Sequence, residues 1–360
     1  MTQPEQVLAR ILKSGARALA GYAVGETPPV DEETAQTAVV TQFDGWQNVL
    51  AARLEELAVA ISTGRPEFFV EQVHWTRAAL KARGVPAEML RARLEALRRV
   101  LVEQIPAELA PMATGYVDRA LAEFDGEPAG LAPRLTAETP AGRLAATYLV
   151  AILEGDRRQA SRLVLNAADE GQRVPELYLR VLQPAQEELG RMWLLGEINV
   201  AEEHFATTTT RLVMAQLHAR EVCGPSNGKT LVAAAVAGNQ HDLGIQVVAD
   251  LFEMDGWRVI QLGSNAPTAD LAQAVEFYDA DLVALSVSLA TQLPALDETV
   301  TAIRASQRGA TVKILVGGCE TMGAADLVKS RGADDYASNA VEAVARGNAL
   351  VGIPAKVQPS

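Results

Sequence analysis

The stretch LVAAAVAGNQHDLG, residues 231–244, decides the fold of the carboxyl-terminal part of this chain. It begins with a continuous apolar run, and Gly238 and four polar residues separate that run from an amphipathic segment that opens at Leu243. An apolar run of this length, ended by glycine and polar residues, predicts a buried strand that leads into a helix. Two further apolar runs end at Ser286-Val287-Ser288 and at Gly317-Gly318.

Strand and helix patterns alternate from here to the end of the chain. We expect strands near 230–237, 257–262, 281–287, 312–316 and 334–337, with helices beginning at Leu243, Pro267, Pro294, Met322 and Asn339. This alternation predicts right-handed crossovers and a five-stranded parallel, Rossmann-like sheet. Because parallel strands end at a shared edge where such sheets bind ligands, His241 is a candidate metal ligand at that edge.

The histidine, the serines and the glycine pair together resemble the cobalamin-binding fold of methionine synthase, corrinoid methyl carriers and cobalamin-dependent mutases. The resemblance runs from about Lys229 to Pro354 and implies that His241 is the lower ligand of cobalt. It also implies that the nucleotide tail of the cofactor runs down a slot at the sheet edge. The residues expected to contact the cofactor here are Asn239, His241, Asp242, Gly244, Ser286, Ser288, Gly317 and Gly318.

Two positions depart from the pattern of that family. Asn239 stands where an aspartate or glutamate usually orients the imidazole and raises its basicity, so the strength of cobalt ligation is open. Ser288 stands where a leucine is often found. The alternative interpretation of His241 is an ordinary loop histidine above a nucleotide-type sheet.

The overall composition of the chain disfavours several classes of function. The chain has 360 residues, 49% of them hydrophobic, and a formal net charge of −13, which disfavours a nucleic-acid partner. It shows no signal peptide and no apolar run of about 18 residues, so we expect a cytoplasmic protein without a membrane partner. Cys223 and Cys319 lie far apart and indicate no disulfide framework.

The rest of the chain has helical patterns, in two parts. Residues 1–126 are an expected all-helical N-terminal module, with segments beginning near Leu8 and spanning 39–61, 66–83, 87–104 and 106–124. Residues 134–222 are an expected four-helix capping bundle, whose first helix is capped by Thr139. The strand-containing domain is expected at 229–356, and composition marks 126–133 as a linker.

A second group of candidate residues lies at a corner of the bundle. Trp193 ends one helix, Asn199 and Glu202 form a capping box for the next, and Glu203 and His204 fall in its first turn. Tryptophan, nine residues, then Glu-His resembles the adenosylcobalamin-dependent, light-responsive repressors of carotenoid genes.

That resemblance implies that Trp193 packs on the adenosyl group, that Glu203 hydrogen-bonds it and that His204 stands close by. Leu194 occupies the position of the histidine that takes the upper cobalt site in those repressors after light, which leaves His204 as the candidate for that role. The alternative interpretation is a packed helix corner with a surface charge pair.

The order of helical module, bundle and cobalamin sheet resembles the photocobilins, which use biliverdin as a second chromophore. The resemblance implies a biliverdin against the N-terminal helices. His74, Trp75 and Arg77, near Phe68 and Phe69, offer an imidazole, stacking surface and a cation for a propionate. The alternative interpretation makes them core aromatics and a surface arginine.

Three functions stay open on the sequence. The first, which we favour, is a light sensor rather than an enzyme, in which photolysis of adenosylcobalamin changes the packing of the bundle and the state of a homo-oligomer. The second is a corrinoid methyl carrier of a methyltransferase system. The third is a regulator that binds cobalamin without photochemistry.

Overall fold

The computed structural model describes residues 3–27, 45–318 and 325–354. The chain divides into two compact units, the first holding residues 1–160 and 181–208 and the second holding residues 161–180 and 209–360. Helix α12 (Val200–His218) contributes its beginning to the first unit and its remainder to the second. In the part of the chain that is described, no helix combines the length and the apolar character needed to cross a membrane.

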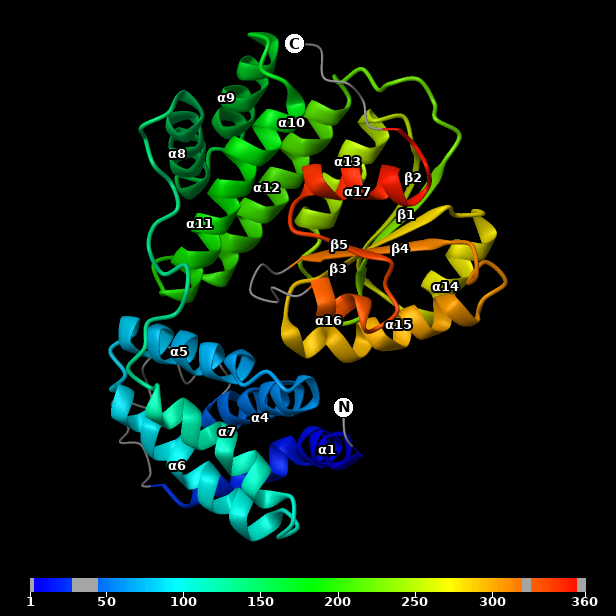
Figure 1. Ribbon diagram of the computed structural model, residues 1–360. Helices are drawn as coiled ribbons and strands as arrows, with labels where there is room; N and C mark the ends of the chain where they lie inside the picture. Colours follow the sequence, from blue (N-terminus) through cyan, green and yellow to red (C-terminus); the bar gives the residue numbers. More distant parts are fainter. Residues whose placement is uncertain (1–2, 28–44, 319–324, 355–360) are drawn as a thin grey trace. The chain divides into compact units, whose positions relative to one another are not determined.

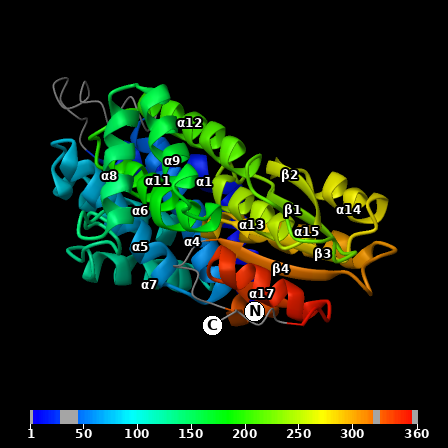
Figure 2. The same ribbon diagram turned by 90° about the horizontal axis from the view of Figure 1, so that it is seen from above.

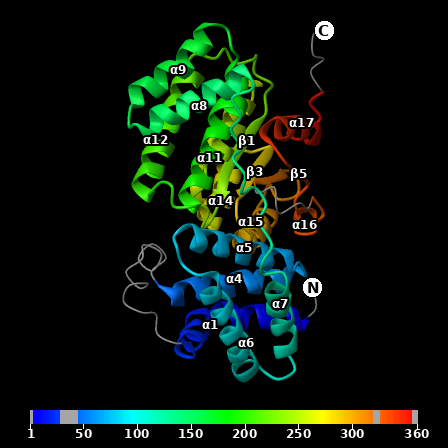
Figure 3. The same ribbon diagram turned by 90° about the vertical axis from the view of Figure 1, so that its left-hand side faces the viewer.

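The amino-terminal part of the first unit is helical, as predicted (Figure 3). Its described helices are α1 (Gln3–Gly25), α4 (Trp46–Thr63), α5 (Glu67–Ala82), α6 (Ala87–Gln104) and α7 (Ala110–Ala122). Leucines at helical spacing are fully buried and form the core: Leu8, Leu12, Leu50, Leu54, Leu57, Leu94, Leu97 and Leu101. The helix expected at 39–61 begins at Trp46, and positions 39–44 lie outside the described residues.

The first unit also holds α8 (Pro140–Leu153) and α11 (Gln183–Leu194), which pack on each other (Figure 2). In the sequence, α9 (Arg157–Asp169), α10 (Val174–Leu177) and a π-helical turn (Tyr178–Leu182) follow α8 and precede α11, and their residues 161–180 belong to the second unit. Thr139 caps α8 by accepting a hydrogen bond from the backbone N–H of Gly142 at 3.0 Å. The predicted capping box of α12 is confirmed, because Asn199 accepts from the backbone of Glu202 while the Glu202 carboxylate accepts from the backbone of Asn199.

The second unit contains the predicted five-stranded parallel sheet. Its strands are β1 (Thr230–Val236), β2 (Arg258–Ala266), β3 (Leu282–Val287), β4 (Lys313–Gly318) and β5 (Asp335–Ala337), in the order β2-β1-β3-β4-β5. Strands β1 and β3 are buried along their whole length, which explains their unbroken apolar sequence. The strand order reverses at β1, so the crevice at the carboxyl ends of β1 and β3 is the expected position for a ligand.

Helices cover both faces of the sheet (Figure 1). On one face lie α13 (Leu243–Met254) and α17 (Ala340–Leu350), and on the other lie α14 (Thr268–Phe277) and α15 (Leu293–Ala305). The short α16 (Ala325–Lys329) packs beside β5. The helix starts expected for α13, α14, α15 and α17 agree with the structure to within one residue, and the start expected at Met322 lies outside the described residues.

Candidate functional site

His241 lies on the loop that joins the end of β1 to the start of α13. Its backbone N–H donates to Asn239 Oδ1 at 3.0 Å. Its imidazole is exposed and, within the described part of the chain, makes no hydrogen bond or ion pair. The loop therefore fixes the histidine by its backbone and leaves both ring nitrogens available to a ligand.

Asn239 is fully buried and connects this loop to the end of β3. Its Nδ2 donates to the carbonyl of Ser286 at 3.1 Å and to Ser288 Oγ at 3.2 Å, while its Oδ1 accepts from the His241 backbone. The amide oxygen expected to orient the imidazole is thus used on the backbone of the histidine instead. A carboxylate could not donate to the Ser286 carbonyl, so Asn239 and Ser288, the two departures from the family pattern, contact and complement each other.

Two further amides brace the same sheet edge, and neither was predicted from the sequence. Gln292 Oε1 accepts from the backbone N–H groups of Ser288 at 2.9 Å and Leu289 at 3.0 Å. Asn265 Oδ1 accepts from the backbone N–H of Gly238 at 2.7 Å. Asn265 adopts a φ of 51°, a left-handed conformation that asparagine tolerates better than most residues. The turn around the histidine is therefore held from β2 and from the segment after β3.

The residues that follow His241 open α13. Asp242 immediately precedes this helix and is paired with Arg211 of α12 through a short charged hydrogen bond. Gly244 lies in the first turn, and a Cβ atom built on it would meet no atom of another described residue within 4 Å, apart from its chain neighbours and the helix's own backbone. Among the described residues, the side of this turn at Gly244 is therefore open, three positions along the chain from His241, whose imidazole has no partner in the same set.

Ser286, Gly317 and Gly318 lie at the ends of the neighbouring strands β3 and β4. Ser286 is buried and stands opposite Gly317 in the strand pairing. Gly318 has a φ of 134°, and a Cβ there would lie 2.0 Å from the carbonyl oxygen of Val287. The packing of the two strands thus requires glycine at 318 whatever the ligand, and contact of these residues with a nucleotide tail stays a prediction.

Helix α13 is also fastened along its length within the second unit. The Tyr178 hydroxyl, in the π-helical turn, donates to Asp250 Oδ2 at 2.8 Å, and His218 Nε2 lies 3.2 Å from Glu253 Oε2. Burial raises the pKa of Asp250, and the hydrogen bond from Tyr178 and the proximity of His218 offset only part of that rise. These contacts and the Asp242–Arg211 pair just before its first residue restrain the helix that follows the histidine loop.

The upper-face candidates Trp193, Glu203 and His204 all belong to the first unit. Glu203 accepts hydrogen bonds from His204 Nδ1 at 2.7 Å and from Thr207 Oγ1 at 2.6 Å, so Glu203 and His204 are in direct contact. Trp193 lies in the last turn of α11, half-buried, and its backbone carbonyl accepts from Arg83 at 3.0 Å. Its ring takes no part in these bonds. Contact of these residues with an adenosyl group stays a prediction.

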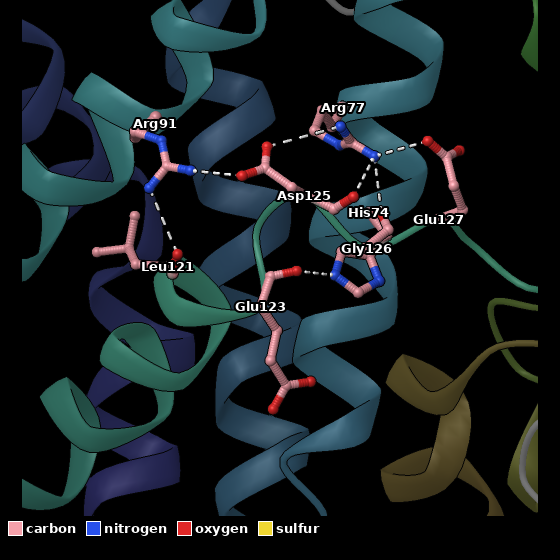
Figure 4. Close-up of polar contacts among 8 residues, drawn as sticks. All are labelled: His74, Arg77, Arg91, Leu121, Glu123, Asp125, Gly126 and Glu127. Carbon is pink, nitrogen blue, oxygen red and sulfur yellow. Dashed lines mark hydrogen bonds and ion pairs between the residues drawn. The ribbon is translucent and has the colours of Figure 1, made fainter.

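The candidates for a bilin site contact other residues of the N-terminal helical region (Figure 4), and their contact with a bilin stays a prediction. His74 and Arg77 are buried, with 7% and 8% of their surface exposed, so the expectation of a surface arginine is wrong. His74 Nε2 donates to the carbonyl of Glu123 at 2.6 Å, and Arg77 donates to the carbonyl of Gly126 at 2.7 Å and the carboxylate of Glu127 at 3.1 Å. Both side chains therefore anchor the segment that follows α7.

Together these features define a class of protein. A single imidazole is a weak metal site by itself, but it suffices where a chelating cofactor supplies the other ligands. The exposed His241 at the switch point of an open parallel sheet, with space beside it and a helical bundle before it in the chain, fits the binding of a corrinoid.

Comparison with known proteins agrees with this class. A family model of the B12 binding domain matches residues 229–345, and a second B12 binding domain model matches residues 144–218. Dimethylamine corrinoid protein 3 of Methanosarcina mazei is 30% identical over 122 residues, which cover 34% of this chain and 71% of that protein. Dimethylamine corrinoid protein 3 of Methanosarcina acetivorans is 31% identical over 122 residues, covering 34% and 56%. A corrinoid protein of Desulfitobacterium hafniense is 27% identical over 209 residues, covering 56% and 94%.

The chain belongs to the corrinoid, B12-binding protein family. It has a helical N-terminal region, a helical B12-capping domain and a Rossmann-like B12 binding domain on the five-stranded sheet. It spans about half the length of the first two curated relatives that it matches, 56% in each case.

Proposed function

We propose that this protein is a cobalamin carrier of a methyl-transfer system, in which His241 is the lower ligand of cobalt. The observation that carries the proposal is the histidine loop, where the backbone of His241 is fixed while its exposed ring has no partner among the described residues. The dimethylamine corrinoid proteins among its relatives support the carrier role. Separate methyltransferases would be its partners, and the protein would not be a catalyst on its own.

The chain's own residues fit the tasks of such a carrier. When bound, a corrinoid supplies an alkyl group held on cobalt. Asn239 and Gln292 keep the histidine loop in place, and Gly244 leaves room beside it. Ser288 accepts a hydrogen bond from Asn239, and its own hydroxyl proton, which no contact among the described residues uses, could be donated to an acceptor on the nucleotide tail.

The ligand assignment is tested with the full chain and methylcobalamin in darkness. We expect the absorption spectrum of bound cofactor in the wild type to show a nitrogen ligand to cobalt, and the His241→Ala variant to lose that signature. The adjacent, exposed Gln240→Ala is the matched control and should leave the spectrum unchanged. Equal spectra for wild type and His241→Ala would refute the assignment.

A second candidate function is a light sensor that uses adenosylcobalamin. The observation that favours it is the cluster of Glu203, His204 and Thr207, which holds a carboxylate and an imidazole together within ten or eleven positions of Trp193. A carboxylate beside an indole suits ribose hydroxyls and an adenine ring.

One experiment separates the two functions. The protein is loaded with methylcobalamin or adenosylcobalamin in darkness, illuminated with green light and passed over a gel-filtration column. A carrier should elute at the same volume before and after light with either cofactor. A sensor should change its elution volume after light only with adenosylcobalamin, through a changed homo-oligomer.

The proposal does not extend to biliverdin. The imidazole and guanidinium expected to bind it already donate to the segment after α7, and Phe68 and Phe69 are buried in the core. Addition of biliverdin should therefore give no red absorption band on the protein. A stable red band would restore a bilin site elsewhere in the N-terminal helices.

A further inference from the structure

Arg83 links the N-terminal helices to the corner that carries Trp193. It caps the carboxyl end of α5, and its guanidinium reaches the last turn of α11 within the same unit. Nη2 donates to the carbonyl of Trp193 at 3.0 Å, and Nη1 donates to the carbonyls of Leu194 and, at 3.0 Å, of Ala79. One cation thus satisfies terminal carbonyls of two helices, where each helix dipole places partial negative charge.

The turn after α11 packs on the stem of the same arginine. Gly196 has a φ of 70°, and a Cβ built there would lie 3.4 Å from Arg83 Cγ, Cζ and Nε. Arg191, on the preceding turn, donates to both carboxylate oxygens of Glu197 at 3.1 Å. The backbone around Trp193 is therefore held from two sides, while the indole takes no part in these bonds.

Other residues of α5 make further contacts toward the capping helices. Glu71 accepts from the backbone N–H of Ala129 at 2.8 Å, and Arg77 binds the preceding segment. Farther on, Arg134 donates through its backbone to Glu188 of α11 at 3.0 Å. The segment at 126–133, predicted to be a linker by composition, is thus attached at both ends, and α5 with α11 forms one connected set of polar contacts.

We propose that Arg83 is a positioning residue that fixes the indole of Trp193 for contact with the upper ligand of the cofactor, so that the N-terminal region sets which cobalamins the protein accepts. This inference rests on the proposed assignment of Trp193 to the upper face. If Trp193 contacts the upper ligand, a large adenosyl group would offer the indole more surface than a methyl group, so the affinity for adenosylcobalamin would depend more on the position of the indole.

The test compares the dissociation constants of adenosylcobalamin and methylcobalamin, measured in darkness by quenching of tryptophan fluorescence. In Arg83→Ala we expect the constant for adenosylcobalamin to rise about tenfold and that for methylcobalamin to change less than about twofold. Lys81→Ala, an exposed cation of the same helix end, is the matched control and should change neither. Arg83→Lys keeps the charge but loses the planar set of guanidinium N–H donors, so it should raise the dissociation constant for adenosylcobalamin by a smaller factor.

A merely structural role is separated by repeating the comparison in a Trp193→Ala background. If Arg83 acts through the indole, Arg83→Ala should cause no further change in the ratio of the two constants there. An unchanged ratio in Arg83→Ala, or an equal shift with and without Trp193, would overturn the inference. If Arg83→Ala does not fold, the ratio measured for Arg83→Lys decides. Failure of the wild type to bind either cobalamin would sink the proposed function as well, whereas normal binding with an unchanged ratio sinks this inference alone.

Discussion

The histidine loop of the second unit and the His74 cluster of the first unit, which consists of His74, Arg77 and residues 123–127, each hold an imidazole. They support that imidazole in opposite ways. At the loop, buried amides hold the backbone of His241 and leave its ring exposed. In the cluster, the ring of His74 and the guanidinium of Arg77 are buried and bonded to backbone carbonyls. An imidazole is ready for a ligand when its support comes from its backbone, and it is a structural anchor when its ring nitrogens provide the support.

The largest expected effect is a loss of stability, caused by a substitution in the His74 cluster. Arg77→Ala removes a buried cation from two backbone carbonyls and the Glu127 carboxylate, which should lower the free energy of unfolding by about 3 kcal/mol. Denaturant unfolding measures this, with the exposed Lys81→Ala as control. Methylcobalamin affinity should not change, and a loss of affinity without a loss of stability would put Arg77 in a ligand site.

The next largest effect is a loss of stability when the side-chain amide of Asn239, which holds the histidine loop, is removed. Asn239→Ala removes the hydrogen bonds that its amide makes with the His241 backbone N–H and the Ser286 carbonyl and should cost about 2 kcal/mol. A double-mutant cycle with Ser288→Ala should give a coupling of about 1 kcal/mol, because the two side chains share one hydrogen bond. Strict additivity would show that the pair does not interact.

His241→Ala should reverse the pattern expected for Arg77→Ala, because it should change cofactor affinity and leave stability nearly unchanged. The ring contributes no described contact, so the free energy of unfolding should stay within about 0.5 kcal/mol of the wild type. The affinity for methylcobalamin should fall about tenfold, equivalent to about 1.4 kcal/mol. Titration of the variant, beside Gln240→Ala, measures this. A large loss of stability would make His241 an anchor like His74.

The smallest effect is a pH dependence in the second unit. Burial raises the folded-state pKa of Asp250 above 3.8, so the folded protein binds more protons than the unfolded chain just above that pH. The stabilising effect of the bound proton is complete at low pH and is lost as pH rises through the raised pKa. Asp250→Asn should flatten this fall, by about 1 kcal/mol. Unfolding curves at several pH values test this, and an unchanged slope would locate the proton elsewhere.

The sheet could be predicted almost completely from the sequence. Central strands of a parallel sheet are buried on both faces, so β1 and β3 are unbroken apolar runs that a pattern reveals. The position of His241 followed from the rule that parallel strands end at one edge. The structural need for glycine at 318, the close Val287 carbonyl, could not be predicted because it depends on strand pairing, and contact of Gly318 with the cofactor stays a prediction.

The supports of the site could not be predicted, because their partners are distant in the sequence. Gln292 reaches Gly238, and Arg211 reaches Asp242, only once the helices have packed. Arg77 lies in a helix whose pattern gives no sign that residues 125–127 cover it. Burial by a segment without periodic pattern is invisible to an analysis of periodicity.

The contact between Asn239 and Ser288 couples the two positions, so the residue tolerated at one depends on the residue at the other. An asparagine introduced while a leucine stood at 288 would have carried a buried N–H with no acceptor on that side, at a cost of about 1–3 kcal/mol. A serine introduced first, beside an acidic residue, could have given its hydroxyl proton to the carboxylate. A serine at 288 is therefore compatible with either an acidic residue or asparagine at 239, whereas a leucine at 288 would leave the asparagine amide short of one acceptor.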